Sequence, residues 1–298
     1  MPSIFASQLK RLAACALAKA IDYQTKAAKL RLVSVEMSFG TICYLDSIEQ
    51  RAKHAILMLH GAGAEKESWL SLAQHLGQTR RIVIPDLPGH GNSSADLSLN
   101  YDISHQTSRV LAFMNRLDLE KVHLIANSMG GAIALRLASQ HPDRLASLQL
   151  IDCAGAQSTP DTITAMFKDG TNNPLVAVRS LADFKLLMNT AMSKPPYIPG
   201  FFLAVLADRK ISRASIDEKI YRDIARDLDQ RAILERIAVP TSIIWGAEDR
   251  ILSVEDAALL HEKIAGSEKL ILEGLGHVPM VEAPKLLASH CLRFLNAL

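Results

Sequence analysis

The stretch Val122-His-Leu-Ile-Ala-Asn-Ser128-Met-Gly-Gly-Ala132 decides the fold of this chain. Residues 122–125 are largely apolar and β-branched, which predicts a short buried strand, and residues 132–139 have the apolar pattern of a helix. Between the two stands Ser128, among small residues. A strand that turns this sharply into a helix strains the backbone of its corner residue. We expect this corner to lift the Ser128 hydroxyl clear of the backbone, at the positive end of the helix.

Residues 126–130 match the nucleophile elbow G-x-S-x-G, except that Ala126 takes the first small position in place of glycine. Alanine is small enough to be a tolerated variant there. Gly130 has no side chain that could block the approach of the helix to the strand. These five residues alone do not exclude an ordinary serine in a strand–turn–helix unit, so the remainder of the chain has to distinguish the two interpretations.

The composition of the chain is that of a globular protein with a sizeable core. It has 298 residues, enough for one large domain or two small ones, and 49% of them are hydrophobic. The formal net charge is +2 and no basic run is present, so we expect no nucleic-acid partner. No apolar run approaches the roughly 18 residues that a membrane span needs. The cysteines lack C-x-x-C spacing and are expected to be reduced core residues: Cys15, Cys43, Cys153 and Cys291.

Short apolar strands alternate with helices along most of the chain. After an opening hairpin at 33–44, the expected strands cover residues 54–59, 81–86, 122–125, 145–152, 240–245 and 269–272. The expected helices cover residues 68–76, 103–119, 132–139, 254–264 and 283–298. This alternation predicts a mostly parallel sheet with helices on both faces.

Residues 155–237 break this rhythm, because they are mostly helical and contain no convincing buried strand. They lie between two core strands, so they should sit over the carboxyl ends of the sheet, where sites in α/β proteins form. We therefore predict a helical cap at 155–237 on a core made of residues 33–154 and 238–298. The apolar stretch at 201–206 suits an acyl-binding surface; packing onto the core is the alternative role for it.

Residues 1–32 form a separate amphipathic segment, in which basic residues outnumber the single acid Asp22. This composition predicts a helix on an anionic membrane surface, with packing on its own domain or on a second copy in a homodimer as the alternative. Lys10 and Arg11 interrupt the apolar stretch that a secretion signal would need. We therefore expect a cytoplasmic or peripherally membrane-associated protein. The apolar face of this helix would carry Phe5, Leu9, Leu12, Ala16 and Tyr23.

A serine nucleophile needs a base within hydrogen-bond reach, and that base needs an orienting group. In this architecture both come from loops after later strands, in the order serine, acid, histidine. Asp249 follows the strand at 240–245, and His277 follows the strand at 269–272. The chain thus offers each group in the loop that the mechanism requires, which predicts a catalytic triad of Ser128, His277 and Asp249.

Acyl transfer also needs hydrogen-bond donors for the oxyanion. The backbone N–H of Met129, directly after the serine, would be one donor, and the N–H of Ala62 in the loop after the first parallel strand would be the other. Small residues in that loop let its backbone approach a substrate. His60, at the end of the strand, is expected to shape the loop and not to act as a base.

Three further acids are weighed against Asp249. Asp152 ends a strand beside the elbow strand and is the alternative orienting acid. Glu248 is a lesser candidate, and Asp86 is expected to hold its own loop. No cluster of residues has metal-ligand spacing, and no phosphate loop or dinucleotide fingerprint appears, so we expect neither a metal nor a cofactor.

From about residue 33 onward the chain resembles the α/β-hydrolase fold family, on five motifs: His60-Gly-Ala-Gly, Asp86-Leu-Pro-Gly-His-Gly, Asn127-Ser-Met-Gly-Gly, Trp245-Gly-Ala-Glu-Asp and Gly276-His. The resemblance implies an eight-stranded, mostly parallel sheet with the cap inserted after strand 6. Within the family, residues 60–69, 127–131 and 240–246 look most like capped bacterial lipases and esterases and membrane-associated monoacylglycerol lipases. Those relatives usually carry an N-terminal membrane anchor, where this chain has its cationic segment.

The expected activity is therefore that of a serine carboxylic-ester hydrolase acting on a small-molecule ester or lipid through an acyl-enzyme. Its substrate pocket should include Gly61, Phe201, Phe202 and Val278. The runner-up is a carbon–carbon bond hydrolase of aromatic ring cleavage, but those enzymes usually have tryptophan where Val278 follows the histidine. A ligand-binding protein on the same fold is the non-enzyme alternative. Such proteins often lose the base or the acid, and this chain has both.

Overall fold

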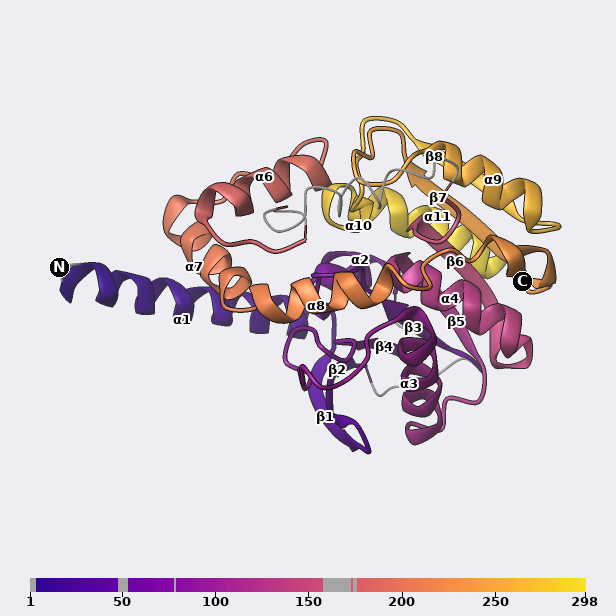
Figure 1. The fold of residues 1–298 in the computed structure, drawn as a ribbon, viewed down its shortest axis with the longest axis horizontal. Coiled ribbons are helices and arrows are strands. Elements are labelled where there is room, and N and C mark those ends of the chain that lie inside the picture. Colours follow the sequence, from indigo (N-terminus) through magenta and orange to yellow (C-terminus); the bar gives the residue numbers. More distant parts are fainter. Residues whose placement is uncertain (1–3, 48–52, 78, 158–172, 174–175) are drawn as a thin grey trace.

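The computed structural model describes residues 4–47, 53–77, 79–157, 173 and 176–298 (Figure 1). Its eight strands form one sheet in the order β1-β2-β4-β3-β5-β6-β7-β8. β2 is antiparallel to β1 and β4, and the other neighbours are parallel, which confirms the predicted mostly parallel sheet. The strands are β1 (Arg31–Met37), β2 (Gly40–Asp46), β3 (Ala55–Leu59), β4 (Ile82–Pro85), β5 (Val122–Ser128), β6 (Leu145–Cys153), β7 (Thr241–Gly246) and β8 (Glu268–Leu272).

The central strands are buried on both faces, because successive side chains point to opposite sides of a strand. In β3, Leu57 and Leu59 join one hydrophobic cluster, whereas Ile56 and Met58 join a second cluster on the other side. The first cluster is covered by α3 (Ile103–Arg116), α4 (Met129–Gln140) and α9 (Glu255–Lys263). The second is covered by α2 (Leu70–His75), α10 (Pro279–Glu282) and α11 (Pro284–Asn296). Helices on both faces are therefore confirmed.

A helical insertion separates β6 from β7, and its described part contains the helices α6, α7 and α8. In Figure 1 the chain runs from α6 at the upper left through α7 to α8 near the centre of the view. α6 begins after Ser180, whose side chain accepts the Asp183 N–H and so caps the helix. α6 and α7 share a small apolar core built around Val178, Phe184 and Ala207. Much of the start of the predicted segment 155–237 lies outside the described residues. The helices are α6 (Leu181–Ala191), α7 (Gly200–Ile211) and α8 (Ala214–Ile224).

The N-terminal segment is a helix, α1 (Ile4–Ala27), which packs along α7 and α2 and projects from the body in Figure 1. Its packed face carries Ala13 and Thr25, both buried. The predicted apolar face lies elsewhere on the helix: Leu12 is 69% and Tyr23 is 74% exposed. The side chain of Phe5 lies outside the described part of the protein. No helix of the described residues is long and apolar enough to span a membrane.

The cysteines do not form one class. Cys153 and Cys291 are buried, as predicted for core residues, and burial raises the pKa of both thiols. Cys15, on α1, is exposed, so the prediction of a core position is wrong there. The reason is that α1 packs through a different face, which leaves position 15 in solvent.

Candidate active site

The turn at Ser128 has no loop residues at all. β5 ends at Ser128 and α4 begins at Met129, so a single residue makes the change of direction. Ser128 has φ 54° and ψ −121°, a strained conformation for a residue with a side chain. A Cβ on Gly130 would lie 2.5 Å from the carbonyl oxygen of Leu59, so only glycine lets α4 pass this close to β3. The strain and the close approach are those that the sequence predicted for the elbow.

His277 and Asp249 meet at the same edge of the sheet, where β7 and β8 end. The Nδ1–H of His277 donates to Oδ2 of Asp249 at 2.7 Å. The other oxygen of Asp249 accepts the N–H groups of Ile251 at 2.7 Å and Leu252 at 3.0 Å, and its side chain is fully buried. These bonds fix the carboxylate and leave Nε2 of the imidazole as the nitrogen free to accept a proton. His277 and Ser128 line one cavity.

Hydrogen bonds to its backbone hold the loop that carries His277. Asn127, which directly precedes the elbow serine, donates from Nδ2 to the carbonyl oxygen of His277 at 3.1 Å. The N–H of His277 donates to Ala191 O in the insertion at 2.8 Å, and the N–H of Gly276 donates to Glu282 Oε1 at 2.8 Å. Sequence reasoning did not predict these roles of Asn127 and Glu282, because they depend on contacts between distant segments.

Ala62 and Met129, the predicted oxyanion donors, lie in the wall of the cavity with Ser128. Met129 is the first residue of α4, so its N–H has no partner within the helix. His60 is buried and has a lowered pKa, first because burial disfavours its charged form. Its neutral ring accepts the Leu87 N–H at Nε2 and donates from Nδ1 to Gly61 O. It therefore shapes this loop, which agrees with the prediction that it is not a base.

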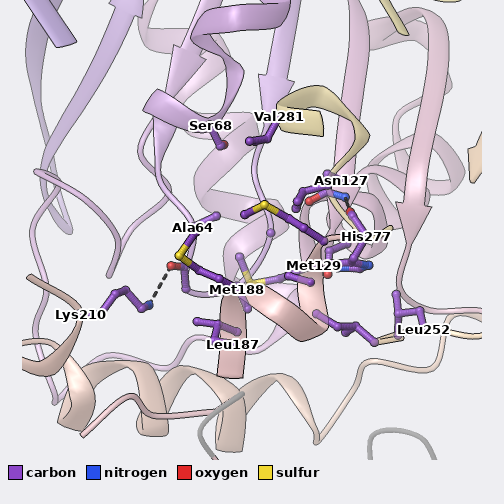
Figure 2. A pocket seen from close by; sticks show the side chains of 18 of the residues that line it. Ala64, Ser68, Asn127, Met129, Leu187, Met188, Lys210, Leu252, His277 and Val281 are labelled. Carbon is purple, nitrogen blue, oxygen red and sulfur yellow. Dashed lines mark hydrogen bonds between the residues drawn. The ribbon is translucent and has the colours of Figure 1, made fainter. Parts of the chain in front are cut away.

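The insertion also holds this loop. Lys210 of α7 donates from Nζ to the carbonyl oxygen of Gly63 at 2.8 Å and pairs with the buried carboxylate of Asp217 at 2.6 Å. Figure 2 shows the first of these bonds at the cavity wall. Lys210 was not among the predicted site residues. No local pattern distinguishes it from other lysines of the insertion.

The three competing acids have different surroundings. Asp86 is buried and accepts hydrogen bonds from Lys66 and from the Asn92 N–H, so it holds its own loop together with a neighbouring one. Glu248 accepts the hydroxyl of Ser193. Asp152 lies beside Asp249, but Asp249 is the acid that bonds to the imidazole.

The cavity itself has a volume of about 370 Å³, and its wall is mostly apolar (Figure 2). Gly61 and Val278 line it, as predicted. Phe201 and Phe202 lie outside its wall, and Phe201 is 55% exposed, so their predicted place in the pocket is wrong. The apolar side chains that the insertion contributes include Phe184, Leu187, Met188, Met192, Ile198 and Leu206.

The error over Phe201 and Phe202 has a physical reason. α7 contributes Leu206 and Lys210 to the cavity wall, and Phe202, one turn earlier on the same helical face, lies beyond the end of the cavity. Phe201 lies on a different face of the helix and is exposed. The spacing of Phe184, Leu187 and Met188 on α6 is that of one helical face, and this was the available signal for the pocket wall.

The parallel sheet, the strained serine corner and the histidine–carboxylate pair define a class of protein. The chain belongs to the α/β hydrolase fold family, whose model matches residues 54–284. It is 33% identical over 272 residues to Lipase 3 of Moraxella sp. (strain TA144), covering 90% of this chain and 85% of the relative. Monoacylglycerol lipase abhd6-A of Xenopus laevis is 30% identical over 277 residues, with 88% and 81% covered.

Among solved structures, the chain is similar to a membrane phospholipase A described as a bacterial virulence factor. The TM-score is 0.90 at 32% sequence identity, and the match covers 96% of this chain and 92% of the other. The likeness therefore includes nearly the whole chain.

Proposed function

We propose that this protein is a serine carboxylic-ester hydrolase that acts on lipids or other esters with an apolar acyl group. The observation that carries the proposal is that the strained Ser128 and His277, which is paired with Asp249, line one apolar cavity. The similarity to proteins named lipase and monoacylglycerol lipase supports the same chemistry.

The reaction would pass through an acyl-enzyme. Ser128 Oγ attacks the ester carbonyl carbon while Nε2 of His277 takes its proton, and Asp249 stabilises the imidazolium. The N–H groups of Ala62 and Met129 hold the oxyanion; each such donor is worth about 2.7–4 kcal/mol in the transition state. His277 then gives its proton to the departing alcohol. Water, activated by the same histidine, attacks the acyl carbon and releases the acid and the free serine.

The apolar wall supplied by α6 would hold the acyl chain. A cavity of about 370 Å³ is within the usual range of small-molecule sites, and its polar groups lie where the ester would react. We assign the insertion the role of a cap, with the boundaries 155–237 on a core of residues 33–154 and 238–298. Its contacts to the loops around Ala62 and His277 support this division, because the cap then completes the site.

The exposed face of α1 supports contact with a membrane surface. Leu9, Leu12 and Tyr23 share one face of the helix and are exposed, while the helix packs on the body through another face. Arg11 and Lys19 add positive charge that would attract anionic lipid headgroups. Lys10 pairs with Asp208 of α7, which joins the helix to the insertion. A second copy of the chain is the other occupant that this face could take.

A chain-length series of p-nitrophenyl esters, from acetate to palmitate, together with monoacylglycerol, tests the proposal. A rate maximum at medium or long chains, lost in Ser128→Ala, is the expected result. A maximum at acetate would leave a small-ester esterase. An absence of ester turnover would contradict the proposal, and dienoate substrates of carbon–carbon bond hydrolases would then be tested. Tight ligand binding without any turnover would indicate a binding protein.

A further inference from the structure

The carboxyl group of Asp152 is a buried group for which the ester-hydrolase mechanism has no use. Asp152 lies near the end of β6, is 0% exposed and has φ 44°, a strained conformation for a residue with a side chain. Its Oδ1 accepts the N–H of Gly246, the last residue of β7, at 2.8 Å. Within the described part of the chain, no donor reaches its Oδ2. A strained and buried polar side chain persists only where its surroundings hold it.

Those surroundings are the acid and the base of the predicted triad. Polar atoms of Asp152, Asp249 and His277 lie within 4.8 Å of one another, and Oδ2 of Asp152 has no other partner among the described residues, so a hydrogen bond between the two carboxyl groups is within reach. Two carboxylates can only accept hydrogen bonds, so such a contact between them requires a proton on one of the two.

The donors around the pair decide which carboxyl holds that proton. Asp249 accepts three N–H groups, from His277, Ile251 and Leu252, so both of its oxygens already serve as acceptors. Asp152 accepts one N–H only. Burial raises the pKa of Asp152 well above its usual range, and the negative charge of Asp249 raises it further, with a smaller contribution from Glu282.

We propose that Asp152 is a positioning residue for the triad: a neutral carboxylic acid whose O–H donates to the Asp249 carboxylate and fixes it against Nδ1 of His277. The proposal rests on the ester-hydrolase function argued above. Asp249 then has a donor on every side, so its carboxylate cannot rotate away from the imidazole. Asp152 does not touch the cavity wall and acts through Asp249 alone.

The proton on Asp152 predicts a specific pH dependence of stability. Above about pH 4 the unfolded chain has released this proton while the folded protein retains it, so folding takes up one proton and stability falls as the pH rises. The charged or titratable groups that face Asp152 are Asp249, Glu282 and His277, and the buried thiol of Cys153 stays neutral.

The first experiment compares the wild type with Asp152→Asn, whose amide can accept from Gly246 and donate to Asp249 without titrating. Urea unfolding from about pH 5 to pH 8 gives the unfolding equilibrium constant of each protein. The ratio of the wild-type constant to that of Asp152→Asn should rise by up to tenfold per pH unit. An unchanged ratio would show that Asp152 is ionised in the folded protein and would overturn the proposal. This measurement needs no activity, so its failure is distinct from failure of the proposed function.

The second experiment measures kinetics. Asp152→Asn should keep kcat within about threefold of wild type, whereas Asp152→Leu, which has no donor, should lose about 10- to 100-fold in kcat with KM within twofold. A folded Asp152→Asn as inactive as Asp152→Leu would overturn the proposal, because the charge would then be the required feature. A third outcome concerns Asp249→Asn. If this variant retains activity and loses it when Asp152 is also replaced, the proposal is overturned, because Asp152 would then be the orienting acid itself.

Discussion

Asn127 donates a hydrogen bond from Nδ2 to the carbonyl oxygen of His277 at 3.1 Å, and the same nitrogen donates to Ile151 O at 3.0 Å. The residue before the elbow serine therefore ties the histidine loop to the strand that carries the serine. A shift of the histidine loop or of β5 is therefore transmitted to the other through the buried side-chain amide of Asn127. Asn127 thus contributes to the relative position of serine and histidine.

Replacing this amide should affect both stability and catalysis. In Asn127→Leu two buried carbonyl groups lose their donor, which should destabilise the protein by about 2–4 kcal/mol and lower kcat at least tenfold. Urea unfolding and steady-state ester hydrolysis measure the two effects. Asn115→Leu, on the exposed side of α3, is the control and should change neither. Wild-type kcat in folded Asn127→Leu would show that the bond does not position the histidine.

Lys210 offers a test of the contact between the insertion and the oxyanion loop. Lys210→Met keeps the apolar stem and removes the bond to Gly63 O, so we expect kcat to fall about tenfold, less than the loss from removing a donor altogether. Lys219→Met is a matched control, because Lys219 also pairs with a buried aspartate, Asp223, at 2.6 Å but lies away from the cavity. Equal kcat values in the two variants would contradict a role for Lys210 in the loop.

The wall formed by α6 should set the preferred acyl length. Leu187→Trp fills part of the cavity, so kcat/KM for octanoate should fall at least tenfold relative to acetate, whereas Leu186→Trp, at an exposed neighbouring position, should keep the wild-type ratio. Competition between the two esters measures the ratio directly. A ratio unaltered in both variants would place the acyl chain elsewhere.

The exposed face of α1 predicts binding to anionic lipid vesicles. Leu9→Asp with Leu12→Asp should weaken binding tenfold or more in a flotation assay, because two apolar side chains and the attraction to the surface are lost. Ala14→Asp with Ala18→Asp adds the same charge at exposed positions off this face and should weaken binding less. If both pairs behave alike, the face does not contact lipid. Sedimentation tests the other occupant of this face. If the wild type is a dimer that the Leu9/Leu12 variant dissociates and the Ala14/Ala18 variant does not, a second copy of the chain covers the face.

Much of the site follows from sequence because its signals are local. The elbow needs small residues around Ser128 at fixed spacing, and Asp249 and His277 follow strands whose order in the chain fixes where they end. The alternation of strands and helices likewise predicts the sheet, since short parallel strands need helices on both faces. These features depend on neighbours in the chain, and the structure agrees with each of them.

The features that could not be predicted depend on which helical face meets which neighbour. Periodicity in α1 identifies an apolar face but not the partner, and the helix packs through Ala13 and Thr25 instead. Phe201 is apolar and stands in the right segment, yet the direction of α7 turns it away from the cavity. The contact of Asp152 with Asp249 arises only when β6 and β7 lie side by side.

The most direct test of the central claim is covalent labelling with a fluorophosphonate, followed by mass spectrometry of the modified peptide. The account predicts one adduct, on Ser128, which blocks ester turnover in proportion to its formation. Ser128→Ala should lose labelling and at least about 1,000-fold in kcat, while Ser108→Ala, on the exposed side of α3, should match wild type. Labelling of Ser128→Ala at the wild-type rate, or an adduct on another serine, would contradict the assignment of Ser128 as the nucleophile.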